Sequence, residues 1–121
     1  MRSTKKSTLD KYWAYRVKEL AGFKCELCGE TKTLSAHHIV GRANHLVRWY
    51  LPNGISLCKE CHTTNPYSAH KNPVWFVRKL IELRGNDWAD ELVLRTASSG
   101  DWRAVMDEIK QYIKGNQGYP L

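Results

Sequence analysis

The residues best suited to chemistry in this chain of 121 residues include its four cysteines, which form two Cys-x-x-Cys pairs. Cys25 and Cys28 make the first pair, and Cys58 and Cys61 make the second. A two-residue gap lets both sulfurs of a pair turn toward one ion, and a tetrahedral zinc ion takes four such ligands at about 2.3 Å. The spacing therefore predicts one structural zinc site with no open coordination position.

The same cysteines have two other interpretations, disulfides and a redox-active pair. Disulfides are typical of secreted proteins, and the start Met1 to Lys6 has no hydrophobic stretch behind it to act as a signal. A thioredoxin-like redox site needs only one pair and a βαβ context, which the sequence pattern lacks. No apolar run approaches the roughly 18 residues that span a bilayer. We therefore expect a cytoplasmic, zinc-binding protein without a membrane segment.

A second set of chemically active side chains lies between and just after the cysteine pairs. Four of the five histidines fall within 26 residues, and the fifth, His70, comes eight residues after the last of them. The 29 residues between Cys28 and Cys58 are more than a zinc-ribbon hairpin requires. A single histidine is more often a surface or core residue than a ligand, but the joint pattern indicates a site. The four clustered histidines are His37, His38, His45 and His62.

The order Cys-x-x-Cys, His-His-Ile, Asn-Gly-Ile-x-Leu-Cys-x-x-Cys-His resembles the HNH nuclease family, which has a zinc-stapled ββα-metal core. The resemblance covers residues 23 to about 70. It implies a metal-dependent endonuclease that hydrolyses DNA phosphodiester bonds, by nicking or by double-strand cleavage. It also implies products with 5′ phosphate and 3′ hydroxyl ends.

The resemblance implies a role for each matching residue. His37 and His62 would be ligands of a catalytic divalent metal, and His38 would be the general base. Asn53 would hold the loop and strand so that the His38 ring points at the attacking water. His70 matches a third histidine found downstream in many members, and its role is left open between metal, phosphate and neither.

Phosphodiester hydrolysis needs a deprotonated water in line with the leaving oxygen, and positive charge beside the phosphate. A neutral imidazole, with an ordinary pKa near 6.5, can accept the proton of that water at cellular pH. Imidazole ligands suit Zn²⁺, Ni²⁺, Co²⁺ or Mn²⁺ better than Mg²⁺, although Mg²⁺ is more abundant in cells. We therefore expect activity with several divalent ions.

Neighbouring residues on a regular strand point to opposite faces, yet His37 and His38 must both serve one site. We therefore expect the strand to be distorted or to end at this pair. The His37 side chain would then lie at the rim and meet His62 from the following helix.

Net charge is +7, with 19 basic and 12 acidic residues and a pI near 9.4. It is +6 over residues 1–48, +3 over 49–84 and −2 over 85–121. A basic surface can serve solubility alone, but this uneven distribution favours a nucleic-acid partner, because Lys and Arg replace phosphate counterions. Arg42 and Arg48 lie between the histidine pair and Asn53, and are either phosphate contacts or solvated loop arginines.

The elements that must position these residues follow from periodicity and turn signals. Apolar residues recur every three or four positions over 8–21, which predicts a helix ending near Gly22, with Leu9, Trp13, Val17 and Leu20 on one face. Strands are predicted over 34–40 and 55–57, paired as a hairpin after the turn signal at residues 52–54. Residues 60–64 have room for a helical start.

The remainder is predicted to be helical. One helix begins after the N-cap Asn72, ends at Gly85, and should bury a stripe of Val74, Val77, Leu80 and Ile81. A second is capped by Asn86 and Asp87 and runs through Leu94. A third runs from Asp101 to Gly115 and has one apolar face (Trp102, Val105, Met106, Ile109, Ile113). The five tryptophans indicate packing, with the role of Trp49 less settled.

Together these patterns predict an α+β, mostly helical single domain over 1–121. Residues 1–22 form a basic arm and helix, 23–70 the ββα-metal core with its structural zinc, and 71–121 a helical extension. DNA is the expected partner, with a protein partner or a homodimer supplying specificity. Two alternatives remain: a non-catalytic zinc-stabilised nucleic-acid-binding module, and a zinc-dependent protein-interaction domain. Target sequence, oligomeric state and biological setting (phage, mobile element or restriction) are left open.

Overall fold

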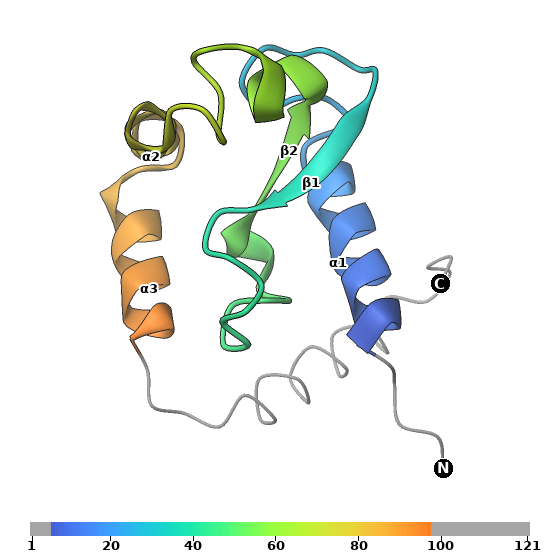
Figure 1. Ribbon diagram of the computed structural model, residues 1–121. Helices are drawn as coiled ribbons and strands as arrows, with labels where there is room; N and C mark the ends of the chain where they lie inside the picture. The colour runs from blue at the N-terminus through green and yellow to red at the C-terminus, as the bar shows by residue number, and fades with distance from the viewer. Residues whose placement is uncertain (1–5, 98–121) are drawn as a thin grey trace.

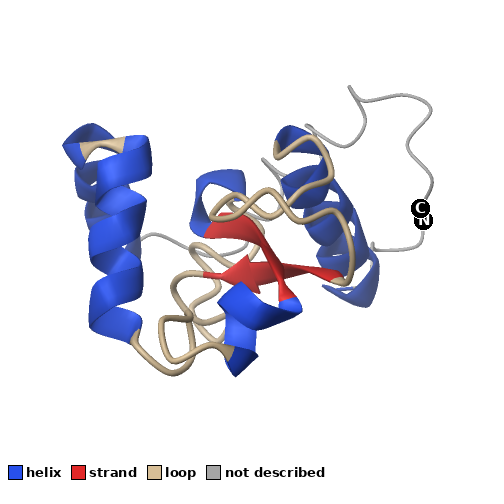
Figure 2. Cartoon of the chain, turned by 90° about the horizontal axis from the view of Figure 1, so that it is seen from above, coloured by secondary structure: helices blue, strands red, loops and turns tan. Residues whose placement is uncertain are grey.

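A two-stranded antiparallel hairpin lies between helices in the computed structural model, which describes residues 6–97 (Figure 1). Helix α1 lies on one side of the hairpin, and α2 and α3 lie on the other (Figure 1, Figure 2). About half of the described residues are helical, so the α+β class is confirmed while "mostly helical" overstates the helix content. The elements in chain order are α1 (Lys6–Leu20), β1 (Leu34–His38), η1 (Leu51–Asn53), β2 (Gly54–Cys58), η2 (Glu60–Thr64), α2 (Pro73–Arg84) and α3 (Asn86–Thr96).

The predicted helix from Asp101 and the basic arm at 1–5 lie outside the described residues. None of the helices between residues 6 and 97 is both long and apolar enough to cross a bilayer.

Helix α1 forms where the apolar period predicts it. Its inner face buries Leu9, Trp13 and Val17, whereas Leu20 at its end is 62% exposed. The helix ends in a Schellman motif, in which Gly22 takes a φ of +68°. The N–H of Gly22 donates to Glu19 O at 2.9 Å, and the N–H of Phe23 donates to Lys18 O at 2.8 Å.

The hairpin pairs β1 with β2 from Leu34 opposite Cys58 to His38 opposite Gly54. The first strand stops at His38 rather than at residue 40. Gly54 opens β2 with extended backbone instead of forming the turn, which is made by η1. A Cβ on Gly54 would lie 2.4 Å from Val17 Cγ2 and 2.7 Å from Trp13 Cζ2. Glycine is therefore needed here because α1 packs directly against the start of β2.

Helix α2 begins as predicted, since the Asn72 side chain accepts a hydrogen bond from the N–H of Trp75 at 3.2 Å. Its predicted buried face is wrong in part. Val74 and Val77 are 81% and 46% exposed, and the fully buried residues are Phe76 and Leu80. Two apolar faces compete on this helix, and the face with Phe76 and Leu80 is the one that packs against Ile55 and Leu57 of the hairpin.

Helix α3 extends to Thr96, two residues beyond its predicted end, and its N-cap is Gly85 rather than Asn86 or Asp87. Its Trp88 is partly buried, and the indole N–H donates to the carbonyl of Pro52 at 2.8 Å.

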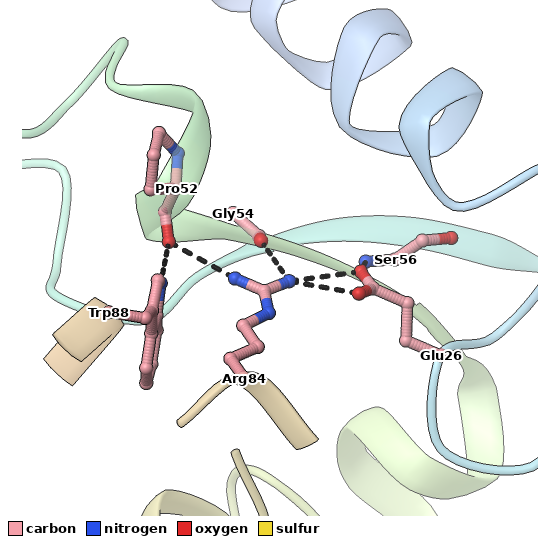
Figure 3. A network of polar contacts seen from close by, with 6 residues as sticks. All are labelled: Glu26, Pro52, Gly54, Ser56, Arg84 and Trp88. Carbon is pink, nitrogen blue, oxygen red and sulfur yellow. Dashed lines mark hydrogen bonds and ion pairs between the residues drawn. The ribbon is translucent and has the colours of Figure 1, made fainter. Parts of the chain in front are cut away.

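Arg84, at the end of α2, joins three parts of the fold (Figure 3). Its guanidinium donates to Glu26 at 2.9 Å, to Gly54 O at 2.8 Å and to Pro52 O at 3.1 Å. Glu26 also accepts from the N–H of Ser56 at 2.9 Å. Because Glu26 lies between the two cysteines of the first pair, this network fixes that pair against β2 and α2.

Two apolar clusters fill the spaces on either side of the hairpin. One lies under α1 and contains Leu9, Trp13, Val17 and Trp49. The other lies under α2 and contains Cys25, Ile55, Leu57, Cys58, Ala69, Phe76 and Leu80. Trp49, whose role the sequence left unsettled, is a core residue with 1% of its surface exposed.

Candidate metal centre

The four cysteines converge on one point, as their spacing predicts. Their sulfurs all lie within 4.8 Å of one another, and Cys28 Sγ and Cys58 Sγ are 3.6 Å apart. The edge of a tetrahedron with zinc–sulfur bonds of about 2.3 Å is about 3.8 Å. None of the cysteines is in a disulfide. These four residues could therefore hold a structural zinc.

The electrostatics of this cluster also fit a cation. Burial raises the pKa of Cys61, and the neighbouring sulfur of Cys25 raises it further. Burial also raises the pKa of Cys25, but N–H groups of Cys58, Cys28 and Leu27 outweigh it, so the net shift is downward. Four packed thiolates repel one another, and a zinc ion at their centre would remove that cost.

A second group of ligand atoms forms from three histidines. The ring nitrogens of His37, His62 and His70 all lie within 4.8 Å of one another. His37 Nδ1 is 3.1 Å from His62 Nε2, and His70 Nε2 is 3.0 Å from the same atom. The expectation that His37 meets His62 at the rim of the hairpin is therefore met. The sequence left the role of His70 open between metal, phosphate and neither. Because its ring joins this pair, His70 is a further candidate metal ligand.

Backbone hydrogen bonds explain how His70 reaches His62 across eight residues. The N–H of Ala69 donates to Cys61 O at 2.9 Å, and the N–H of His70 donates to His62 O at 3.1 Å. The segment after η2 therefore folds back on itself. It returns to the residue that joins the two ligand clusters, because Cys61 belongs to the first cluster and His62 to the second.

The convergence of three ring nitrogens favours a bound cation over hydrogen bonds among the rings. His62 Nε2 has one in-plane position, which holds either a proton or a lone pair, yet two nitrogens approach it. Neighbouring nitrogens of one metal ion, at bonds of about 2.1 Å, are about 3.0–3.4 Å apart. The distances of 3.0 and 3.1 Å fall in this range.

Burial of His37 and His62 keeps these two rings in the form that binds metals. Burial, together with the charges on His62, His70 and His38, lowers the pKa of His37 to about 4. Burial likewise lowers the pKa of His62, helped by His70. Near pH 7 these imidazoles are neutral and have lone pairs for a cation.

His38 points away from this cluster, toward α1. Its ring stacks on Trp13 with centroids 3.8 Å apart and planes within 9°. Its Nε2 is 2.8 Å from the carbonyl oxygen of Arg48. A carbonyl only accepts, so this nitrogen carries the proton and Nδ1 keeps the lone pair. Burial lowers the pKa of His38, which favours the neutral ring near pH 7. The two histidines therefore face opposite sides of the end of β1, as regular strand geometry requires. Of the two expected alternatives, the strand ends at this pair and is not distorted there.

Asn53 is completely buried and binds the loop that follows His38. Its Oδ1 accepts from the N–H of Val40 at 2.8 Å. Its Nδ2 donates to Val40 O at 2.9 Å and to Val47 O at 3.1 Å. This side chain binds both ends of the segment 40–47, as expected of a residue that holds the loop.

The two candidate phosphate contacts differ in their surroundings. Arg42 is exposed, and its charge lowers the pKa of His38. The Arg48 guanidinium instead binds the Asp10 carboxylate twice, at 3.0 and 2.7 Å. Burial raises the pKa of Asp10, but the hydrogen bonds from Arg48 and Trp49 outweigh it and hold that pKa low. Arg42 thus remains the more accessible of the two.

Two residues near His38 were not predicted for this site. Trp13 was expected only as a core residue, and Asp10 was not singled out. The available signal was a carboxylate three residues before Trp13, on the face of α1 that should be apolar.

Comparisons with protein-family models, with curated proteins and with solved structures found no match to this chain. Its function is therefore inferred from the residues of the site and their geometry.

Proposed function

We propose that this protein is a metal-dependent endonuclease of the HNH type, which hydrolyses DNA phosphodiester bonds. The observation that carries the proposal is the arrangement at the end of β1. His37, His62 and His70 present three converging nitrogens, and the adjacent His38 has a proton fixed on Nε2. A site with only a structural role would need neither feature. We also propose that the core is of the ββα-metal type, in which η2, with its five residues, is the short helix.

In this proposal His37, His62 and His70 would hold the catalytic divalent ion. That ion would supply positive charge to the scissile phosphate and to the departing 3′ oxygen. The donor set of three imidazoles suits Mn²⁺, Ni²⁺, Co²⁺ or Zn²⁺, and Mg²⁺ less well. The four cysteines would hold a separate structural zinc.

His38 would act as the general base through Nδ1. It would take a proton from water while the water oxygen bonds to phosphorus and the bond to the 3′ oxygen breaks. The 3′ oxygen would leave with a proton from solvent, giving a 3′ hydroxyl and a 5′ phosphate. Asn53 would keep the loop in place, so that the Arg48 carbonyl continues to accept from Nε2. The exposed Arg42 would contact a phosphate.

Plasmid cleavage tests the proposal. Zinc-loaded protein should convert supercoiled DNA to open-circular or linear product with Mn²⁺, Ni²⁺, Co²⁺ or Mg²⁺. EDTA should stop the reaction, and excess divalent ion should restore it. The product ends should accept label from polynucleotide kinase only after phosphatase treatment. Intact plasmid with every ion, together with tight duplex binding, would replace the proposal with a non-catalytic nucleic-acid-binding module.

A further inference from the structure

Helix α1 lies outside the segment that resembles the nuclease core, yet it contacts His38 directly and through Arg48. We propose that Trp13 and Asp10 of α1 are positioning residues, which hold the His38 ring in one orientation with its Nδ1 edge open. This inference rests on the proposed function for its catalytic consequence. Its structural part, the fixed ring, is measurable without any activity.

Trp13 fixes the plane of the His38 ring. The rings are parallel within 9° at a centroid distance of 3.8 Å, so the indole is stacked on one face of the imidazole. Trp13 is itself fixed, because it is 2% exposed and its indole N–H donates to Tyr50 O at 3.0 Å. Rotation of the imidazole about its Cβ–Cγ bond would drive ring atoms into the indole.

Asp10 fixes the acceptor that selects the tautomer of His38. Its two oxygens accept from Arg48 at 3.0 and 2.7 Å, and Oδ1 also accepts from Trp49 Nε1 at 2.9 Å. These two side chains flank the peptide group whose carbonyl oxygen, that of Arg48, accepts from His38 Nε2 at 2.8 Å. Without Asp10, the loop would hold this carbonyl less firmly, and the choice between Nε2–H and Nδ1–H would weaken.

The ion pair between Glu26 and Arg84 provides a matched control for Asp10 (Figure 3). In the Asp10–Arg48 pair the arginine and acid side chains are 16% and 25% exposed, and in the control pair 20% and 27%. Each arginine makes two contacts with its carboxylate. The substitutions Asp10→Asn and Glu26→Gln therefore each remove one carboxylate charge from a similar ion pair. Only the Asp10–Arg48 pair contains the residue whose carbonyl accepts from His38, which is Arg48.

The first readout is the tautomer of His38, measured by long-range ¹H–¹⁵N correlation on zinc-loaded protein. Wild type and Glu26→Gln should show a pure Nε2–H form, whereas Asp10→Asn should show a mixture with Nδ1–H. The second readout is plasmid nicking, where Asp10→Asn should lower kcat about tenfold with little change in KM, because misorientation affects the reacting step. Glu26→Gln, once its zinc content is measured as equal to that of wild type, should keep the wild-type kcat.

Trp13 is tested by a pair of substitutions, because a buried tryptophan can be needed for folding. Trp13→Leu should mix the tautomers and lower kcat, and Trp13→Phe, which keeps a flat ring, should restore most of both. Trp88→Phe is the control, since Trp88 also donates to a loop carbonyl, that of Pro52. If Trp13→Leu does not fold, the comparison of Asp10→Asn with Glu26→Gln decides.

An unchanged Nε2–H tautomer in folded Asp10→Asn and in folded Trp13→Leu, with kcat equal to that of the controls, would overturn the inference. If wild type fails to cleave any plasmid while the tautomers shift as described, the endonuclease proposal fails and the positioning by α1 stands.

Discussion

The imidazole of His38 lies flat against the indole of Trp13, with ring centroids 3.8 Å apart. The two residues are 25 positions apart in the chain, and Gly54 makes their contact possible. It is paired with His38 across the hairpin and has no Cβ to hold α1 away. The packing of α1 and the orientation of His38 therefore depend on the same contact.

Gly54→Ala should lower the free energy of unfolding by about 1–3 kcal/mol, because the added methyl would overlap Val17 and Trp13. Urea denaturation measures the change. Gly41→Ala is the control, since no atom lies within 4 Å of a Cβ built there, and it should alter stability by about 0.5 kcal/mol or less. Equal effects of the two substitutions would show that α1 does not pack as described.

Asn53→Ala should lower the free energy of unfolding by at least about 2 kcal/mol, because the three hydrogen bonds of this buried side chain to Val40 and Val47 are lost. Nicking should fall as well, although His38 is intact. Asn44→Ala, which removes a single contact to Leu46 N, should cost about 1 kcal/mol or less. A stable Asn53→Ala protein with full activity would show that the Asn53 side chain is not needed to hold the loop.

His70→Ala should weaken binding of Ni²⁺ or Co²⁺ to zinc-loaded protein by at least about tenfold, since one of three converging nitrogens is removed. Isothermal titration calorimetry measures the affinity, and zinc content should stay constant. His45→Ala is the control, because His45 lies outside the cluster and packs against Trp49. Equal affinities of wild type and His70→Ala would leave His70 without a metal-binding role.

Cys58→Ser should lower zinc content and thermal stability together, because zinc binding contributes to the folding free energy. Atomic emission and circular dichroism measure the two quantities. Ser56→Ala, two residues earlier on the same strand, is the control. Its buried hydroxyl has no hydrogen-bond partner in the described part of the chain, so its loss should change stability little. A Cys58→Ser protein with full zinc and unchanged stability would contradict the zinc site.

Local patterns predicted most elements of the described fold. The hairpin, the three α-helices and the short helix at η2 form near their expected positions, because caps, turns and apolar periods are local signals. The buried face of α2 was not predictable, since Val74 and Phe76 both lie on plausible apolar faces and only packing against the hairpin chooses between them.

The candidate site was predictable where ligands follow fixed spacing. Cys-x-x-Cys pairs bring sulfurs together by local geometry, so the cysteine cluster was expected. The place of His70 depends on two backbone hydrogen bonds from residues 69 and 70 to residues 61 and 62, which no local pattern indicates. The contacts of Asp10 and Trp13 with the hairpin and its loop depend on tertiary packing across 25 to 39 residues.

The role of His38 is tested most directly by the nicking rate of His38→Ala beside that of His45→Ala, with both proteins zinc-loaded and folded by circular dichroism. Removing a general base costs about 10²- to 10⁴-fold, so His38→Ala should lose activity by that factor while His45→Ala stays close to wild type. A folded His38→Ala protein that nicks plasmid as fast as wild type would contradict the role of His38 as general base.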